Sequence, residues 1–562
     1  MAKLRWVVAL AALALMPCAA PAEPAPRIPI DSFAALPFLR SPILSPNGKL
    51  IIAKAKVKDS NRLVIMNADD PTASPRQIQI GKTPITAIHW AGNDRLLLEV
   101  MGTGELYGVE IPFGRLIVMD LSTGAMRVAD PNSRGVYGGD VLFVSSSGDW
   151  ALVASQDDLF KTPSVKRVDL ATGKAVVVEK SKPDVWDWFV DDAGLVRGGV
   201  AYDERRWKLW YRSKAGEPFQ IVRGKFEKDS DSAVDRFYFS RDGDKGTIVT
   251  NERNGRFGVY RYNFATAEIG EVVYENSRVD ISNVIMDPGT RDVIGVRYHE
   301  DRWKTHWLDP KVEALQARID RALPAADNEI LGDPAIDKRM LVWSGGASNP
   351  GTYFLFDQSK KSMSPVIQPF DKIDPNQLAE VRAVSYKSRD GLDIPAYLTL
   401  PKGKEANKLP LILLPHGGPF SRDEWEYDPL VQFLANRGYA VFQPQFRGST
   451  GYGKDFVSKG YGEWGRKMQD DLDDGVDWLA STGQIDTKRV CIVGGSYGGY
   501  AALWGAIRNP DRYRCAASVA GVTDIEAQLR SNRKSFAATR YFRQWRTKVQ
   551  GEDRVDLKTV SP

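Results

Sequence analysis

Two different patterns of hydrophobic and polar residues divide the chain near residue 375. In the first part, short hydrophobic runs alternate with polar turns that contain glycine, which is typical of β-strands joined by hairpins. Four turns are especially clear, because each combines glycine with Asn, Asp or Ser directly before a hydrophobic run. The runs that follow these turns are residues 49–53, 150–154, 195–200 and 246–250.

The spacing of these turns indicates a repeated architecture. They lie roughly 45 to 100 residues apart, which corresponds to one or two four-stranded propeller blades. About 340 residues at ~45 residues per blade predict a seven-bladed β-propeller over residues 27–375. An array of β-sandwiches is the structural alternative. Residues 313–323 are predicted to form a helix, whose place within a blade the pattern does not define.

In residues 376–562, hydrophobic strands alternate with amphipathic helices. Residues 409–414 are a continuous hydrophobic run, as expected of a strand buried on both faces. Alternation of this kind predicts an α/β domain with a mostly parallel sheet and helices on both faces. The predicted strands are residues 394–400, 409–414, 439–446, 489–493 and 515–519; the predicted helices are residues 429–437, a helix with Met468, Leu472, Val476 and Leu479 on one face, and residues 497–508.

Composition and charge exclude several functions. A chain of 562 residues is too long for one core, and its 43% hydrophobic and 26% charged residues are ordinary for a globular protein. The net charge of +5 comes without a basic stretch, so nucleic acid is a poor candidate partner. The four histidines are scattered and lack metal-ligand spacing. We therefore expect neither a metal nor another cofactor.

The first residues have the pattern of a secretory signal. Lys3 and Arg5 precede a hydrophobic run that is too short to span a bilayer, and small residues follow at 20–22. We predict a signal peptide over residues 1–22 and export to the periplasm or the exterior. An uncleaved anchor is the alternative, and Pro17 disfavours lipid attachment at Cys18. No later segment is hydrophobic enough to be a stable membrane span.

Two cysteines remain after cleavage, Cys491 and Cys515. Both lie in hydrophobic runs predicted as strands, where cysteine usually behaves as a small buried hydrophobic residue. We adopt that interpretation, because regular neighbouring strands rarely give the geometry of a disulfide. A disulfide is nevertheless compatible with an exported protein.

Residues 494–498, Gly-Gly-Ser-Tyr-Gly, match the G-x-S-x-G nucleophile elbow of α/β-hydrolases. The motif lies where a predicted strand ends and a predicted helix begins, which is the context that the elbow requires. Glycines flanking the serine permit the strained turn, and the helix N-terminus favours negative charge on the reacting oxygen. Ser496 is therefore the candidate nucleophile; a purely structural glycine turn is the alternative.

Residues 416–419, His-Gly-Gly-Pro, follow the buried strand 409–414. This is the position from which the fold supplies one N–H group of its oxyanion hole. We expect the backbone N–H groups of Gly418 and Tyr497 to form the donor pair, with His416 and Gly417 as supporting residues of the loop. His416 is expected to order the loop rather than to act as general base. An ordinary Gly-Pro loop is the alternative.

Residues 448–454 resemble a phosphate-binding loop at first. The pattern fails at Asp455, because a Ser or Thr hydroxyl should hold magnesium at that position and a carboxylate repels phosphate. Nucleotide binding is therefore disfavoured.

Three motifs in order resemble the prolyl oligopeptidase family of serine peptidases, and especially its acylaminoacyl-peptidase and dipeptidyl-peptidase branches. They are the His416 motif, the Phe446-Arg447-Gly448-Ser449-Thr450-Gly451 run and the Ser496 motif. The resemblance implies a propeller that caps the active site, short peptide substrates and acylation of Ser496. Arg447 is a supporting residue of its loop, and either substrate contact or a structural ion pair would explain it.

The remaining triad residues are not found after Ser496. The fold orders the triad as Ser, acid and His, but no histidine follows Ser496. The resemblance implies that both lie beyond residue 562, so we expect an incomplete hydrolase domain. A fragment of an active enzyme and a natural inactive truncation are both open. Asp524 is a candidate acid, with a turn or capping role as its alternative.

Two other functions compete with a peptidase. An esterase would use the same chemistry, although simple esterases lack a propeller. A non-catalytic binding protein would use the propeller as its working surface. Bond specificity and oligomeric state are open at this stage.

Overall fold

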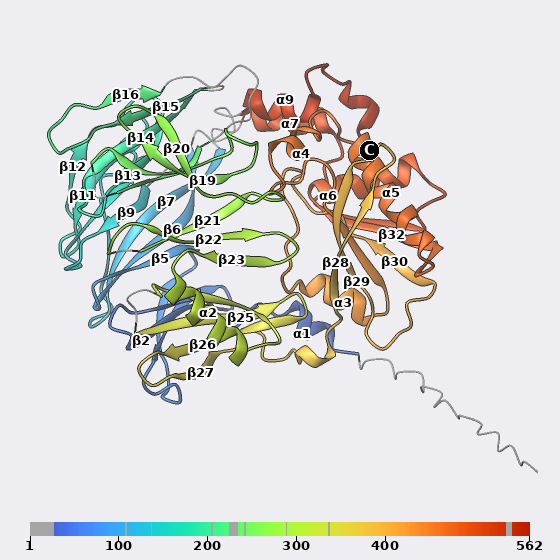
Figure 1. The fold of residues 1–562 in the computed structure, drawn as a ribbon, viewed down its shortest axis with the longest axis horizontal. Helices are drawn as coiled ribbons and strands as arrows, with labels where there is room; N and C mark the ends of the chain where they lie inside the picture. The colour runs from blue at the N-terminus through green and yellow to red at the C-terminus, as the bar shows by residue number, and fades with distance from the viewer. Residues whose placement is uncertain are drawn as a thin grey trace, which may run out of the picture.

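The computed structural model describes residues 27–562 except 107–108, 137, 204–205, 224–233, 241–242, 288, 335–337 and 535–541. Within these residues the chain forms two domains that lie side by side (Figure 1). The predicted signal segment, residues 1–22, lies outside the described residues, so export stays a prediction. No helix in the described part of the chain is long and apolar enough to cross a membrane.

The first domain is a ring of seven antiparallel sheets, which confirms the predicted seven-bladed β-propeller over the β-sandwich alternative (Figure 1). Every sheet is built from consecutive strands. The first four blades are β1 (Arg40–Leu44) to β4 (Arg76–Gly81) with β2 (Leu50–Val57) and β3 (Ser60–Asn67); β5 (Ile85–Ala91), β6 (Arg95–Leu106), β7 (Val109–Asp120) and β8 (Met126–Val128); β9 (Gly138–Val144), β10 (Trp150–Ser155), β11 (Ser164–Asp169) and β12 (Ala175–Glu179); and β13 (Val185–Val190), β14 (Val196–Asp203), β15 (Arg206–Tyr211) and β16 (Gln220–Arg223).

The other three blades complete the ring. Blade six has three strands in the described residues, and the other two have four. Their strands are β17 (Val234–Phe239), β18 (Lys245–Thr250), β19 (Gly258–Asn263) and β20 (Glu268–Tyr274); β21 (Ile281–Met286), β22 (Val293–His299) and β23 (Trp303–Trp307); and β24 (Asp327–Leu331), β25 (Arg339–Gly346), β26 (Asn349–Asp357) and β27 (Ser362–Ile367).

The four glycine turns identified in the sequence share one place in the fold. They precede β2, β10, β14 and β18, each of which is the second strand of its blade. Gly48, Gly148 and Gly194 have φ between 70° and 75°, a left-handed conformation that glycine adopts without strain. The turn chemistry therefore marks the first hairpin of a blade.

Side chains close the ring, because the first and last sheets share no strand. Ile51 and Ala53 of β2 pack in one core cluster with Leu341 of β25. Arg339 of β25 donates to the carbonyl oxygens of Gly48 (2.7 Å) and Ala68 (2.9 Å) in the first blade. Hydrophobic packing and one arginine thus join the two ends of the propeller.

The predicted helix of residues 313–323 is α2 (Pro310–Ala322), and it follows the three-stranded blade. Asp309 caps its N-terminus by accepting from the Lys311 N–H. Leu315 and Ile319 pack against Met340 and Val342 of β25. After the third strand of this blade, β23, the chain therefore forms α2, whereas in the other blades a fourth strand comes at this point. The helix packs on the last blade.

The second domain has a six-stranded sheet in the order β28-β29-β31-β30-β32-β33. The first three strands pair antiparallel, and the pairs β31–β30, β30–β32 and β32–β33 are parallel, so the predicted α/β-hydrolase class is confirmed. Its elements are β28 (Val381–Lys387), β29 (Asp393–Thr399), β30 (Leu409–Leu413), β31 (Ala440–Pro444), β32 (Ile485–Gly495), β33 (Cys515–Val519), α3 (Pro429–Asn436), α4 (Lys454–Ser458), α5 (Lys467–Ser481), α6 (Tyr497–Arg508), α7 (Ile525–Lys534) and α9 (Phe542–Gln550), with short 3₁₀ turns at Pro375–Gln377 and Leu557–Val560.

Helices cover both faces of this sheet. The predicted hydrophobic face of α5, with Met468 and Leu472, packs in one core with Tyr500 of α6. On the other face, Val431 of α3 packs against Ile412 of β30. The N-terminal helix α1 (Ile30–Ala34) also packs here, since its Phe33 ring lies 5.8 Å from that of Phe433.

The interpretation of Cys491 and Cys515 as separate buried residues is wrong. The two cysteines form a disulfide, and their Cα atoms lie 4.7 Å apart. They are direct partners in the register of β32 and β33, which brings the Cα atoms within the usual range for a disulfide. Cys515 is also exposed rather than buried. The parallel register decided a pairing that sequence spacing alone disfavoured.

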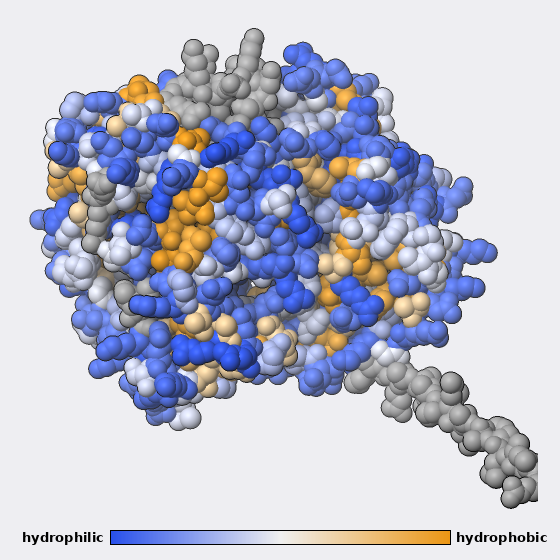
Figure 2. Space-filling model, viewed as in Figure 1, coloured by the Kyte–Doolittle hydropathy of each residue, from blue (hydrophilic) through white to orange (hydrophobic). Residues whose placement is uncertain are grey.

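One face of the protein is mostly hydrophilic. Figure 2 shows a face on which hydrophilic residues predominate and hydrophobic residues gather in a few places. Among the exposed hydrophobic side chains are Val176, Val177 and Val178 of β12 and Ile221 of β16, all on fourth strands of blades. Such strands lie at the outer edges of their sheets, where one side has no partner strand.

Candidate active site

Ser496 stands at the junction of β32 and α6. Its backbone has φ 54° and ψ −119°, a conformation that is strained for a residue with a side chain and typical of a nucleophile elbow. The Ser496 N–H donates to the Val519 carbonyl at the end of β33 (2.9 Å), which anchors the turn. The residue is exposed. The strand therefore ends by presenting the hydroxyl at the surface of the domain.

Glycines around Ser496 are required by close backbone contacts. A methyl group on Gly494 would lie 2.4 Å from the Gly498 carbonyl, and one on Gly498 would lie 2.1 Å from the Pro415 oxygen. Gly499 is similarly confined, because an added methyl group would lie 2.7 Å from Ser518 Oγ. Real Cβ atoms do not approach other atoms so closely, so α6 can cross the end of the sheet only without these side chains.

Tyr497, the first residue of α6, is held by an aromatic cluster. Its side chain is 1% exposed and its ring contacts those of Phe446, Trp464 and Tyr500 at centroid distances of 4.7 to 5.5 Å. The hydroxyl donates to Met468 Sδ (3.1 Å). Burial raises the pKa of this phenol well above its ordinary value. The side chain thus fixes the position of the Tyr497 backbone N–H next to Ser496.

The glycine loop lies directly beside the nucleophile. A methyl group on Gly417 would lie 3.6 Å from Ser496 Cβ and 3.5 Å from the Gly495 oxygen. Gly418 has φ 118° and is followed by a cis peptide bond to Pro419. The loop that follows β30 and the elbow that follows β32 therefore meet at one end of the sheet, as adjacent parallel strands require.

His416 fixes the conformation of this loop through contacts of both its ring nitrogens. Its Nδ1 lies 2.6 Å from the Gly417 oxygen and its Nε2 lies 2.9 Å from the Ser449 hydroxyl, which itself donates to the Phe446 oxygen (2.7 Å). Burial lowers the pKa of His416 to about 4, which keeps the ring neutral. The Gly417 carbonyl is thereby turned toward the imidazole. Since carbonyl and N–H point in opposite directions across a trans peptide, the Gly418 N–H points away from that ring.

The reacting groups are left without internal partners. Within the described residues, neither the Gly418 N–H nor the Tyr497 N–H donates a hydrogen bond to another residue. Over the same residues, no side chain hydrogen-bonds Ser496 Oγ. Both nitrogens of His416 are already engaged, so this histidine is not positioned as the base for Ser496. The arrangement offers an unbonded hydroxyl and two free amide donors in one place.

Comparison with known proteins agrees with this geometry. A family model described as the prolyl oligopeptidase family matches residues 425–562. Residues 425–562 are a domain of the prolyl oligopeptidase family. The chain is also 29% identical to dipeptidyl aminopeptidase BIII of Pseudoxanthomonas mexicana, an alignment that covers 94% of this chain and 77% of the relative. Family and relatives together indicate a serine peptidase, which confirms the resemblance seen in the sequence.

Solved structures support the architecture of the whole chain. A puromycin-hydrolyzing peptidase of Mycobacterium tuberculosis matches with a TM-score of 0.70 at 15% identity, covering 97% of this chain and 86% of that one. The acylaminoacyl peptidase of Pyrococcus horikoshii matches with a TM-score of 0.61 at 17% identity, covering 95% and 85%. At these identities the similarity concerns the fold, a propeller joined to the peptidase domain.

Arg447 of the prolyl oligopeptidase family domain lies in a buried ion-pair network. Its guanidinium donates to both carboxylate oxygens of Asp471 (2.6 and 2.8 Å) and of Asp390 (2.8 and 3.0 Å). Asp471 is fully buried on α5, and Asp390 lies in the turn between β28 and β29. The hydrogen bonds from Arg447 hold the pKa of Asp390 well below its ordinary value. Of the two explanations for Arg447, the structure shows the ion pair.

We expect Arg447→Met to destabilise the family domain by about 3–5 kcal/mol, because Asp471 would stay buried without its partner. The matched control is Arg382→Met, which removes an ion pair with Glu380 whose two side chains are 54% and 69% exposed and should change stability by less than ~1 kcal/mol. Urea unfolding at pH 7 measures both. Since the hydrogen bonds from Arg447 lower the folded pKa of Asp390, the part of the wild-type advantage that comes from Asp390 should be complete above about pH 4 and decline as the pH falls further. Equal losses in the two variants would contradict this.

The other sequence candidates have structural roles. Residues 448–454, which resemble a phosphate loop, contact the propeller instead: the Lys454 N–H donates to the Gly255 oxygen (2.8 Å). Asp524 is exposed and accepts from the Ala527 N–H (2.8 Å) at the start of α7, which is the capping alternative. No group of His, Cys, Asp and Glu side chains in the described residues is arranged to hold a metal ion.

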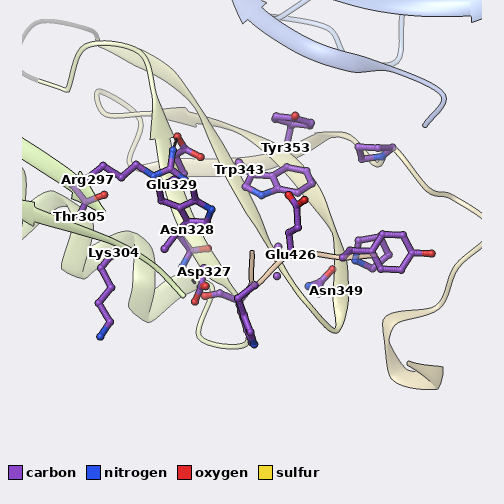
Figure 3. A pocket seen from close by; sticks show the side chains of 18 of the residues that line it. Arg297, Lys304, Thr305, Asp327, Asn328, Glu329, Trp343, Asn349, Tyr353 and Glu426 are labelled. Carbon is purple, nitrogen blue, oxygen red and sulfur yellow. Dashed lines mark hydrogen bonds and ion pairs between the residues drawn. The ribbon is translucent and has the colours of Figure 1, made fainter. Parts of the chain in front are cut away.

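A cavity of about 780 Å³ lies between the propeller and the family domain. Trp343 of β25 and Tyr353 of β26 line it from the propeller, and Glu426 lines it from the loop before α3 (Figure 3). The Trp343 and Tyr353 rings pack at 4.6 Å. The sequence did not predict this cavity, because Tyr353 and Glu426 on its two sides are 73 residues apart in the chain. The role of Asp471 was missed because its pairing with Arg447, 24 residues earlier, depends on how α5 packs.

Proposed function

We propose that the protein is a serine peptidase that hydrolyses short peptides through an acyl-enzyme on Ser496. The observation that carries this proposal is the exposed, unbonded Ser496 hydroxyl on a strained elbow, beside the free N–H groups of Gly418 and Tyr497. Preorganised donors of this kind stabilise the charge that develops on a carbonyl oxygen, and losing one typically costs about 3–4 kcal/mol of barrier.

In the proposed reaction, Ser496 Oγ attacks the substrate carbonyl carbon while a base takes the hydroxyl proton. The carbonyl oxygen becomes an oxyanion between the two N–H groups. The C–N bond then breaks, the amine leaves with a proton, and water hydrolyses the resulting ester to regenerate Ser496. The family resemblance assigns the base to a histidine that follows Ser496 in chain order. Residues 497–562 contain no histidine, so the reaction requires a form of the protein that carries this base.

Two features support short peptides as substrates. The P. mexicana relative is a dipeptidyl aminopeptidase by name, and the similar fold from M. tuberculosis belongs to a puromycin-hydrolyzing peptidase. The propeller also contacts the loops that surround Ser496, for example through Asp280, whose N–H donates to the Gly451 oxygen (2.9 Å). A propeller in this place would restrict access for folded proteins.

The test compares three substrate types on the purified protein in a form that includes the triad histidine: peptides with a free amino terminus, the same peptides with an acylated amino terminus, and p-nitrophenyl esters. We expect peptide turnover, together with covalent labelling of Ser496 by a fluorophosphonate probe. Mass spectrometry of the labelled peptide identifies the site. Turnover of esters alone would favour an esterase, and absence of both labelling and turnover would favour a binding protein.

A further inference from the structure

The loop that carries the oxyanion glycines continues directly into a contact with the propeller. We name residues 416–428 the oxyanion loop and residues 299–303, between β22 and β23, the docking segment. The Trp425 N–H donates to His299 Nε2 (3.0 Å), and the Trp303 indole N–H donates to the Glu424 carboxylate (3.2 Å). His299 is 2% exposed, and burial lowers its pKa to about 4, so Nε2 stays an acceptor. The two domains therefore meet at the same loop that lies beside Ser496.

Arg422 joins three separate segments at this contact. Its guanidinium donates to the carbonyl oxygens of His299 and Glu300 in the docking segment, at 3.2 Å each. It also donates to the Tyr452 hydroxyl (2.9 Å) and lies 4.5 Å from the centre of that ring. One planar side chain thus binds the oxyanion loop to the propeller and to residues 446–454 at once.

The loop of residues 446–454 is itself fixed to the propeller. Asp280 donates its N–H to the Gly451 oxygen (2.9 Å), and its carboxylate accepts from the Gly453 N–H (3.2 Å). Gly451 leaves room for Arg422, because a methyl group there would lie 2.6 Å from Arg422 Nη1. The backbone on both sides of Tyr452 is therefore held by the propeller, so that Arg422 donates to a hydroxyl whose position is fixed.

The oxyanion glycines depend on such anchors. Gly417 and Gly418 have no side chains to pack, so contacts on either side of them determine their position. His416 supplies the upstream anchor through Ser449. Arg422 follows Gly418 by four residues, which limits the separation of their Cα atoms to about 14 Å. Arg422 is the first downstream side chain in the oxyanion loop that contacts the propeller through hydrogen bonds.

We propose that Arg422 is a positioning residue for hydrolysis, which holds the Gly418 N–H in place by fixing the oxyanion loop to the propeller and to Tyr452. The proposal rests on the proposed function of Ser496. A guanidinium suits this role because its five N–H donors form a rigid planar fork, whereas a lysine ammonium is a compact point charge. Hydrolysis at Ser496 then depends on correct docking of the propeller, although the propeller supplies no reacting group.

The test is Arg422→Ala with a matched control, Ser348→Ala. Ser348 of the propeller donates its hydroxyl to the Ala379 oxygen of the second domain (2.8 Å), so the control removes an interdomain hydrogen bond that does not involve the oxyanion loop. We expect Arg422→Ala to lower kcat about 10- to 100-fold, because a misplacement near 1 Å costs up to that much. KM should stay within about threefold, and Ser496 should react with the fluorophosphonate probe more slowly by the same factor as kcat. Ser348→Ala should keep kcat within about threefold of the wild type.

Chemical rescue separates positioning from a general loss of structure. Guanidinium at millimolar concentration should restore part of the kcat of Arg422→Ala without affecting Ser348→Ala, because it can occupy the vacated site. All rates are expressed per folded molecule, measured by circular dichroism. The proposal is overturned if Arg422→Ala keeps the wild-type kcat, if Ser348→Ala loses as much, or if guanidinium restores nothing. If the wild type is active and Arg422→Ala is equally active, only the positioning role of Arg422 is rejected. If the wild type neither reacts with the probe nor hydrolyses peptides, the proposed function is rejected as well.

Discussion

Ser496→Ala is expected to abolish peptide hydrolysis, with kcat reduced by on the order of 10⁵-fold or more. The reason is that the acyl-enzyme needs the Ser496 oxygen, while the Gly418 and Tyr497 N–H groups can only stabilise charge. The free amide donors would remain, so a small residual rate above that of water is compatible with the proposal. Initial rates with the best peptide substrate, together with probe labelling, measure the loss.

The matched control for this variant is Ser458→Ala. Ser458 is exposed at the end of α4, and its hydroxyl donates to the Asp455 oxygen (3.2 Å). Its removal should leave kcat within about twofold and labelling at Ser496 unchanged. If Ser496→Ala hydrolysed peptides at the wild-type rate, another residue would have to be the nucleophile.

The second large effect is expected for Gly498→Ala. The added methyl group would lie 2.1 Å from the Pro415 oxygen and 3.1 Å from the His416 oxygen. Both atoms belong to the backbone immediately before the oxyanion glycines, so relief of the clash must move α6 or that loop. Because displacement of reacting groups by about 1 Å can cost 10²-fold, we expect kcat/KM to fall at least ~100-fold.

Gly495→Ala is the control within the same motif. A methyl group on Gly495 would lie 3.8 Å from the Val519 oxygen, an ordinary contact, and the residue is exposed. We expect kcat/KM within about threefold of the wild type. Circular dichroism of both variants separates a local shift from unfolding. Equal activity of the two alanine variants would show that the contact between α6 and the oxyanion loop does not govern catalysis.

Both experiments test how the Ser496 hydroxyl is aligned with the two amide donors. The hydroxyl and the two amide donors come from different segments, and their alignment depends on backbone contacts closer than most side chains permit. The interdomain contact of Arg422 extends this relation beyond the family domain. Catalysis at Ser496 would then be sensitive to substitutions on the propeller side, such as those in the docking segment, even though no propeller residue hydrogen-bonds Ser496 within the described residues.

Features with local causes could be predicted from the sequence. The elbow at Ser496 needs only a strand, a glycine-flanked serine and a helix in direct succession. The hairpin turns before β2, β10, β14 and β18 rest on glycine and polar residues within four positions, and their spacing was sufficient to predict seven blades. The alternation of strands and helices after residue 376 likewise predicted the hydrolase class.

Features that join distant segments were decided by the tertiary structure. The register of β32 and β33 paired Cys491 with Cys515, against the sequence interpretation. Packing of α5 brought Asp471 to Arg447, and domain docking brought Arg422 to the carbonyl of His299, 123 residues away in the chain. Turn and capping preferences act over a few residues and are visible in the sequence. Register and docking depend on which surfaces bury each other, and that is settled only when the whole chain packs.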